Sequence, residues 1–423
     1  MTESTVMSER RVSLIGALLV AIGPISMALY TPAMTELVRY FDSTQSVIKL
    51  TLTIYFGGFA CAQLIAGPLS DALGRRPITI AFMGLYCLGS ILALSAPTVE
   101  ILIAARFLQG IGASAGIAIS RALVRDLFTH EKSSRIMNLI GIILALGPAF
   151  APTIGGLMLP IFGWRSIFVL MMVIGFAVIA VTIFAMKETV VADKSRLNFR
   201  ELGRSYKMVL TNRHFVTASL VIGGALGAIY AQATFLPFIL MGDVGLSPSQ
   251  FGASMLAQSG SFFVASLVCR RMMSTFGADR LVGPGLVFIA IGSFGVSTLL
   301  LWPPSFLHVM VPVSLYSFGI AFVMPAMSTA ALAPFGRSAG AAASMLGFIQ
   351  MGSGLLMGSI GALMGNATFA MGILIPIMGG VACAAFLVYR KIGPPAPLPI
   401  QPNAQARSGP PLGENAPVMN ADK

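Results

Sequence analysis

The sequence has few charged residues and little of what catalytic or metal sites need. Charged residues make up 10% of the 423 residues, whereas about a quarter of a soluble domain is charged. The chain therefore cannot cover a surface that faces water on all sides. Its three histidines (His130, His214 and His308) lie far apart, and no acidic metal motif accompanies them. We predict that the protein is not an enzyme and holds no metal or cofactor.

The cysteines are also few and lack the spacing of a disulfide framework or a metal site. All four lie inside or at the ends of apolar runs, which favours a packing role (Cys61, Cys87, Cys269 and Cys383). We expect no cleavable signal peptide, because the first apolar run, about 12–38, is longer than a signal-peptide core.

Apolar sequence is what the chain has in abundance. Hydrophobic residues make up 56% of it, and its mean hydropathy is +0.86. A membrane-spanning helix needs roughly 20 apolar residues, so there is room for about twelve. We predict an all-α polytopic membrane protein in the lipid bilayer, with spans near 12–38, 46–70, 77–97, 101–125, 134–158, 166–187, 213–239, 248–274, 280–302, 305–332, 338–364 and 368–391.

The net charge of +12 could suggest nucleic-acid binding, but the distribution of the basic residues favours a membrane topology. With the N-terminus inside, 23 of the 27 Lys and Arg fall in cytoplasmic segments and three in outer ones. Basic loops stay on the cytoplasmic side of a membrane. We therefore predict that both termini are cytoplasmic and that nucleic acid is not a partner.

A charged segment divides the spans into two sets of six. It runs from Lys187 to Arg213, and a weak repeat places Gly74 and Gly277 at matching points of the two halves. Two similar halves around a central ligand site are common in transporters. We predict a six-helix bundle over 1–187, a cytoplasmic linker over 188–212, a second bundle over 213–391 and a disordered cytoplasmic tail over 392–423.

The segment GPLSDALGRRP (67–77) between the second and third spans has the most specific pattern. It resembles the Gly-x-x-x-Asp-x-x-Gly-Arg-Arg loop of the major facilitator superfamily. The resemblance implies the major facilitator fold, in which this loop acts as a cytoplasmic gate. The implied gate residues are Asp71, Gly74, Arg75 and Arg76, joined by the basic–acidic pair Arg125 and Asp126 at the inner end of the fourth span.

Within the fourth span, Arg106 and Gln109 match the superfamily's Arg-x-x-Gln-Gly motif. The resemblance associates this arginine with proton coupling, and we expect it to face a cavity or a polar partner. An arginine near the outer end of a span can instead extend to the membrane interface.

The fifth span carries LGPAFAPTIGG (146–156), whose order resembles the antiporter motif of superfamily exporters: Pro148, Pro152, Gly155 and Gly156. The first span carries ALYTPA (28–33), similar to the bicyclomycin- and chloramphenicol-resistance (Bcr/CflA) branch of the twelve-span drug:proton antiporters. These resemblances imply an efflux transporter of the bacterial inner membrane, monomeric, with a small organic substrate and protons as its ligands.

The chain departs from that branch at Ala28, where the branch usually has an aspartate. Glu36 is then the one carboxylate placed within a predicted span, and we assign it, with Tyr30 nearby, to proton coupling. Alternatively, Glu36 is a solvated residue paired with Arg39, and the protein is an uncoupled facilitator or exchanger. A non-transporting membrane sensor is a further alternative. Aromatic and neutral polar residues that we expect to line the cavity favour amphiphilic, neutral or zwitterionic substrates (Tyr30, Tyr55, Gln63, Tyr230, Gln232, Phe235, Gln258 and Gln350).

Overall fold

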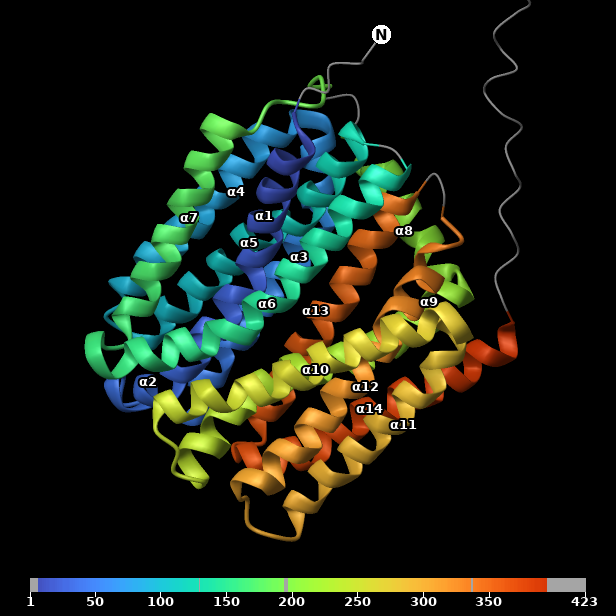
Figure 1. Cartoon of the computed structure of the whole chain (residues 1–423). Coiled ribbons are helices and arrows are strands. Elements are labelled where there is room, and N and C mark those ends of the chain that lie inside the picture. Colours follow the sequence, from blue (N-terminus) through green and yellow to red (C-terminus); the bar gives the residue numbers. More distant parts are fainter. Residues whose placement is uncertain (1–6, 129, 194–196, 336–337, 394–423) are drawn as a thin grey trace, which may run out of the picture.

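The computed structural model describes residues 7–128, 130–193, 197–335 and 338–393, with some side chains of α6 and that of Phe199 left out. This described part consists of helices and their connections (Figure 1). The first half contains α1 (Glu9–Tyr30), η1 (Thr31–Ala33), α2 (Met34–Tyr40), α3 (Gln45–Leu73), α4 (Arg75–Leu94), α5 (Val99–Leu127), α6 (His130–Phe162) and α7 (Arg165–Ala185). The second half contains α9 (Arg213–Pro237), the π-helical η3 (Phe238–Asp243), α10 (Pro248–Phe276), α11 (Ala278–Ser297), η4 (Thr298–Leu300), α12 (Phe306–Leu332), α13 (Ala339–Leu363) and α14 (Ala367–Ile392).

These helices confirm the predicted polytopic all-α fold. Within the described residues, 11 helices are long and apolar enough to cross a membrane, and α6 adds a shorter apolar stretch, Ala149–Phe162. The ends of the predicted spans lie within a few residues of the ends of the long helices, with α1, η1 and α2 together filling the first span, because the apolar pattern stops where each helix stops. The expectation of a disordered tail falls almost wholly on 394–423, outside the described residues.

Local sequence accounts for several helix ends. Ser247 and Gln250 form a capping box at the start of α10, and the Asn366 side chain accepts a hydrogen bond from the backbone of Phe369 at the start of α14. Such caps satisfy N–H groups that have no partner within the helix. At equivalent points of the two halves, Gly74 (φ 101°) and Gly277 (φ 78°) separate α3 from α4 and α10 from α11. These positive φ values favour glycine.

The two bundles contact each other along α3 and α13 and along α6 and α10. At one end of the molecule, which we call the α2 end, η1 also contacts α9 and α10, and α2 contacts η3. The opposite end carries the start of α1 and the end of α14. In Figure 1 the ribbons of the two halves converge at the α2 end and diverge toward the opposite end.

The linker between the halves contains a helix that the sequence analysis did not predict. This helix, α8 (Phe199–Thr211), begins at Asn198, whose side chain accepts hydrogen bonds from two backbone N–H groups. The Tyr206 hydroxyl donates to the carbonyl of Leu64 in α3 (2.5 Å), and α8 also contacts α13. Burial raises the pKa of Tyr206 to about 12, so its hydroxyl keeps the proton that it donates. Helix α8 therefore joins both halves at the opposite end.

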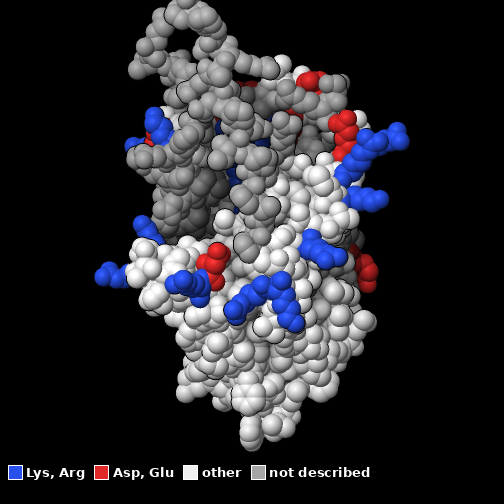
Figure 2. All heavy atoms as spheres, turned by 90° about the vertical axis from the view of Figure 1, so that its right-hand side faces the viewer, with Lys and Arg blue, Asp and Glu red and all other residues white. Residues whose placement is uncertain are grey.

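The surface charge fits a protein embedded in lipid. Figure 2 shows basic side chains gathered in a band across the middle of one face, above a region almost free of charge. The second half contributes exposed basic residues from the ends of α10, α11 and α14 at the opposite end of the molecule: Arg270, Arg271, Arg280, Arg390 and Lys391. Large exposed side chains on many spans are hydrophobic, among them Phe184, Phe294 and Leu363. Lipid is the solvent that such a surface requires.

Candidate functional site

The junction of α3 and α4 brings together the residues of the predicted gate. Gly74 separates the helices, with Asp71 in the last turn of α3 and Arg75 at the start of α4. A Cβ added to Gly74 would lie 2.7 Å from Oε2 of Glu188. Glycine is therefore favoured here both by its positive φ and by the close approach of an acidic side chain.

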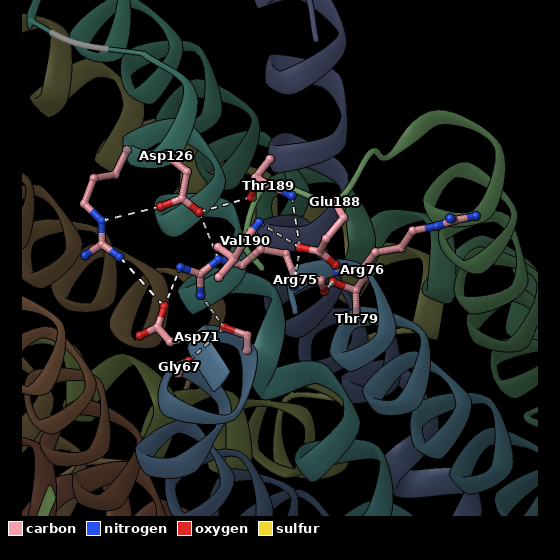
Figure 3. A network of polar contacts seen from close by, with 11 residues as sticks. Gly67, Asp71, Arg75, Arg76, Thr79, Asp126, Glu188, Thr189 and Val190 are labelled. Atoms are coloured by element: carbon pink, nitrogen blue, oxygen red, sulfur yellow. Dashed lines mark hydrogen bonds and ion pairs between the residues drawn. The ribbon is translucent and has the colours of Figure 1, made fainter. Parts of the chain in front are cut away.

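Arg75 is the centre of this network (Figure 3). Its side chain is 2% exposed and forms an ion pair with Asp71. Its Nε donates to Asp126 (3.0 Å), and its Nη1 donates to Oγ of Ser70 (2.6 Å). A buried arginine with two carboxylates and a hydroxyl has good compensation for its lost hydration. These contacts hold the neighbouring ends of α3, α4 and α5 together.

Glu188, just after α7, is a member of the network that the sequence analysis missed. Its carboxylate accepts hydrogen bonds from the backbone N–H groups of Arg75 (2.8 Å) and Arg76 (3.0 Å). It therefore caps α4, where unpaired N–H groups and the helix dipole both favour an anion. The guanidinium of Arg76 donates to the carbonyl of Ile183 (2.7 Å). The sequence around Glu188 gives no sign that its side chain contacts the start of α4, because that contact depends on how the segment after α7 packs.

Arg125 has a looser place in the network. Its side chain is 62% exposed and lies 4.0 Å from Asp71 and 3.9 Å from Asp126. Asp126 also accepts a hydrogen bond from the hydroxyl of Thr189 (3.1 Å). All the residues that Figure 3 labels belong to the first half and the segment after α7. The network therefore joins helix ends of one bundle at the opposite end of the molecule.

A second polar cluster surrounds Arg106 inside the first bundle. The side chain is fully buried, and its guanidinium lies 4.4 Å from the ring centres of both Tyr30 and Tyr55. Its Nη1 donates to Oε1 of Gln109 (2.7 Å), and Gln109 donates in turn to Ser90 (2.8 Å). Arg106 thus has the polar partner that we expected and does not extend to the membrane interface.

Hydroxyl groups complete this cluster without supplying a negative charge. Tyr30 shares a hydrogen bond with Thr51 (2.6 Å), and Tyr55 donates to the carbonyl of Gly23 (2.9 Å). Within the described residues, Arg106 forms no ion pair, and its Nε and Nη2 are buried without an acceptor. Its described partners are therefore aromatic ring faces, one amide and the sulfur of Met171.

Glu36 lies apart from the Arg106 cluster. It occupies α2, is partly exposed, and lies close enough to the backbone of Trp164 and to Arg39 for both to act on it electrostatically. Its described contacts include none with Arg106. Tyr30, Arg106 and Gln109 are therefore brought together, whereas Glu36 lies near the α2 end of the molecule.

The antiporter-like segment of α6 lies where the two halves meet. Thr153 donates to the carbonyl of Gly252 in α10 (2.9 Å), and Ser249 donates to the carbonyl of Gly156 (3.1 Å). Gly156 packs against the backbone of Pro248, and Gly155 against that of Leu29 in α1. The Pro152 carbonyl contacts Gly252. Pro148 belongs to α6, but its side chain lies outside the described residues. Small residues here let the backbones approach closely.

None of these clusters resembles a metal site. Among the residues that the structure describes, no group of three or more His, Cys, Asp or Glu could hold a metal ion. The acids that do gather, Asp71 and Asp126, bind arginine instead.

Comparisons with known proteins agree with this architecture. The family model of the Major Facilitator Superfamily matches residues 16–362. The MFS-type transporter YdgK of Bacillus subtilis is 30% identical, and the match covers 88% of this chain and 94% of the relative. Multidrug resistance protein D of Escherichia coli is 27% identical (86% and 91% covered). The bicyclomycin resistance protein homolog of Haemophilus influenzae is 26% identical (86% and 92%).

Solved structures share the fold at lower sequence identity. The xylose transporter XylE of E. coli, in a partially occluded inward-open conformation, has a TM-score of 0.70 at 13% identity. The match covers 91% of this chain and 98% of the XylE chain. The human organic anion transporter MFSD10 has a TM-score of 0.66 at 19% identity, covering 90% and 99%. These matches span both bundles. The chain therefore belongs to the major facilitator superfamily, in agreement with the resemblance to its drug:proton antiporter group.

Proposed function

We propose that this protein exports drugs or small organic metabolites across a bacterial inner membrane by proton-coupled antiport. The observation that carries the proposal is the position of the antiporter-like segment, whose Gly156 packs against Pro248 of the second half while Thr153 donates to Gly252. The multidrug-resistance relatives, similar over almost the whole chain, support export as the direction of transport.

In this proposal the halves alternate between two arrangements. The distribution of basic residues supports an orientation with the α2 end outside and both termini in the cytoplasm. The contacts of η1 and α2 with the second half then correspond to a closed outer side. Outward opening would separate these contacts, while the Asp71–Arg75–Asp126 network would close the inner side, the role that the resemblance assigns to it.

Neutral polar and aromatic groups at the contact between the halves support an uncharged or zwitterionic amphiphile as substrate. Phe56 of α3 and Tyr230 of α9 face each other across the halves, with ring centres 5.3 Å apart. In the second half, the amide of Gln258 donates to Gln232 (2.9 Å). Aromatic faces and amide groups can hold such a substrate without requiring a fixed charge.

Proton coupling needs a group that binds and releases a proton during transport. Arg106 keeps its proton at physiological pH, and Ala28 cannot bind one, so we assign this role to Glu36. The competing proposal is an uncoupled facilitator or exchanger. The absence of an ion-paired carboxylate from the described surroundings of Arg106 favours that alternative.

The test is transport in proteoliposomes with and without an imposed pH gradient, for a panel of amphenicols, bicyclic peptides, siderophores and amino acids. We expect the parent protein to move a substrate faster with the gradient, and Glu36→Gln to lose this dependence while keeping downhill exchange. Asp42→Asn is the matched control, because Asp42 is exposed and its φ of 46° suits asparagine.

Each other outcome points to a different mechanism. Gradient-driven transport that survives Glu36→Gln unchanged would remove Glu36 from the coupling. Transport of the parent without any gradient effect would support the facilitator. If none of the panel moves, the sensor alternative gains support.

A further inference from the structure

Lys49 is a buried cation at the α2 end to which no superfamily motif in the sequence assigns a role. It lies in the second turn of α3, in the first half, and is 0% exposed. Its Nζ donates to the carbonyl of Gly365 (2.6 Å), in the turn between α13 and α14 of the second half. Gly365 adopts a φ of 74°, which glycine readily allows in such a turn.

The surroundings of the amine also come from the second half. Nζ lies 5.5 Å from the ring centre of Phe238 and 5.9 Å from that of Phe235. Asp243 is near enough to act on Lys49 electrostatically, but its carboxylate accepts a hydrogen bond from Thr368 (2.6 Å). Among the described residues, Lys49 forms no ion pair within 4.0 Å. A carbonyl and two rings therefore hold the charge.

The other described hydrogen bonds that join the two bundles directly involve neutral groups. Thr35 contacts the sulfur of Met241 at 4.0 Å, and the α6–α10 pairs join hydroxyls to carbonyls. Hydrogen bonds with one charged partner are roughly twice as strong as neutral ones. Cation–π contacts with the two phenylalanine rings add to this bond. Lys49 is thus placed to make the strongest single polar contact between the halves at this end.

We propose that Lys49 holds the outer side of the transporter closed. This inference rests on the alternating-access transport proposed above, and it assigns to Lys49 the control of the equilibrium between the closed and the open outer side. When the halves separate at the α2 end, the amine loses the carbonyl of Gly365 and both rings at once. All of these partners lie in the second half, so they move away from the amine together.

The experiment measures access to the closed outer side from outside the cell. Thr53 is the reporter position: it lies one turn after Lys49 in α3, is 0% exposed and packs against Gly358 of α13. Intact cells that produce the Thr53→Cys variant are treated with a membrane-impermeant maleimide. The rate at which the maleimide labels the introduced cysteine is then compared between this variant alone and the same variant with a second substitution. The parent chain with its four natural cysteines supplies the background rate.

We expect Lys49→Met to increase the labelling rate of Thr53→Cys about tenfold, the change that about 1.4 kcal/mol makes in an equilibrium. Methionine keeps the length and the apolar contact but removes the charge and the donor. Lys49→Arg keeps the charge and a donor, so its labelling rate should lie closer to that of the parent than the rate of Lys49→Met does. Phe238→Leu removes one ring and should give an intermediate rate, which tests the same contact if Lys49→Met reduces the amount of folded protein.

Two controls make the result decisive. Arg39→Met removes an exposed basic residue of α2 from the same end and should leave the rate unchanged. Leu301→Cys, 73% exposed between η4 and α12, should label rapidly in every variant and shows that the reagent reaches this side.

An unchanged rate in both Lys49→Met and Phe238→Leu would overturn the proposal, and so would an equal increase in Arg39→Met. The assay needs no substrate and no proton gradient. Its result is therefore separate from whether the protein exports a given compound or couples to protons.

Discussion

At the scale of single residues, the surroundings of Arg106 are unusual for a buried charge. Two tyrosine rings and Gln109 are its main partners, and two of its nitrogen atoms have no described acceptor. Burying a charge without an opposite charge costs free energy. A residue that is retained at such a cost is expected to serve transport rather than stability.

This reasoning predicts opposite effects of one substitution. Arg106→Met should keep the melting temperature of the purified protein within a few degrees of the parent, or raise it, because an apolar side chain removes the desolvation cost. Transport in proteoliposomes should fall at least about tenfold. Arg106→Lys, which keeps the charge but not the planar fork, should also transport poorly. A large loss of melting temperature in Arg106→Met would show that the arginine is structural.

Asp71 allows a similar separation of stability from function. Its side chain is 45% exposed, and Arg75 keeps Asp126 and Ser70 as partners when the Asp71 charge is removed, so we expect little effect on folding. Asp71→Asn should therefore be inserted and folded normally but transport about tenfold more slowly, since the gate would lose its negative charge. Glu201→Gln is the control, because it removes an acidic residue of α8 outside the gate network, and it should transport like the parent. Full transport by Asp71→Asn would remove the gate role carried over from the superfamily.

At the scale of helices, the contact between α6 and α10 depends on residues without bulky side chains. A Cβ on Gly252 would lie 2.5 Å from the carbonyl oxygen of Pro152 and 2.8 Å from Cα of Thr153. Both are backbone atoms, so a rotamer change cannot relieve the clash. The two helices would have to move apart.

A pair of glycines in α10 tests this contact. Gly252→Ala should lower transport at least about tenfold and should destabilise the closed outer side, because overpacking costs about 1–3 kcal/mol. Gly260→Ala is the matched control in the same helix, since a Cβ there would meet no described atom within 4 Å. Transport and external labelling of Thr53→Cys report the two effects. Equal behaviour of the two variants would contradict the importance of the close approach.

At the scale of the whole molecule, the proposed orientation has a direct test. Leu301 is 73% exposed between η4 and α12, and Val191 is 86% exposed after α7. In intact cells, an impermeant maleimide should label Leu301→Cys at once, but Val191→Cys only after the membrane is permeabilised. The reason is the excess of Lys and Arg on the Val191 side. The reverse labelling pattern would invert the proposed topology.

The sequence alone determined the membrane fold, the boundaries of the spans and the superfamily. Apolar runs of spanning length can fold in only a few ways in lipid, because backbone groups must be satisfied within helices or closed barrels. The motif around Gly74 could also be predicted, because a glycine at a turn and a pair of arginines in a loop are features of the local sequence.

The tertiary structure decided which distant residues meet. Glu188 caps α4 from beyond α7, Tyr206 reaches Leu64, and Lys49 crosses to Gly365, more than 300 positions later in the chain. It also placed Glu36 apart from Arg106. Such contacts depend on how whole helices pack, and a backbone carbonyl or ring face that receives a charge leaves no mark at its own position in the sequence.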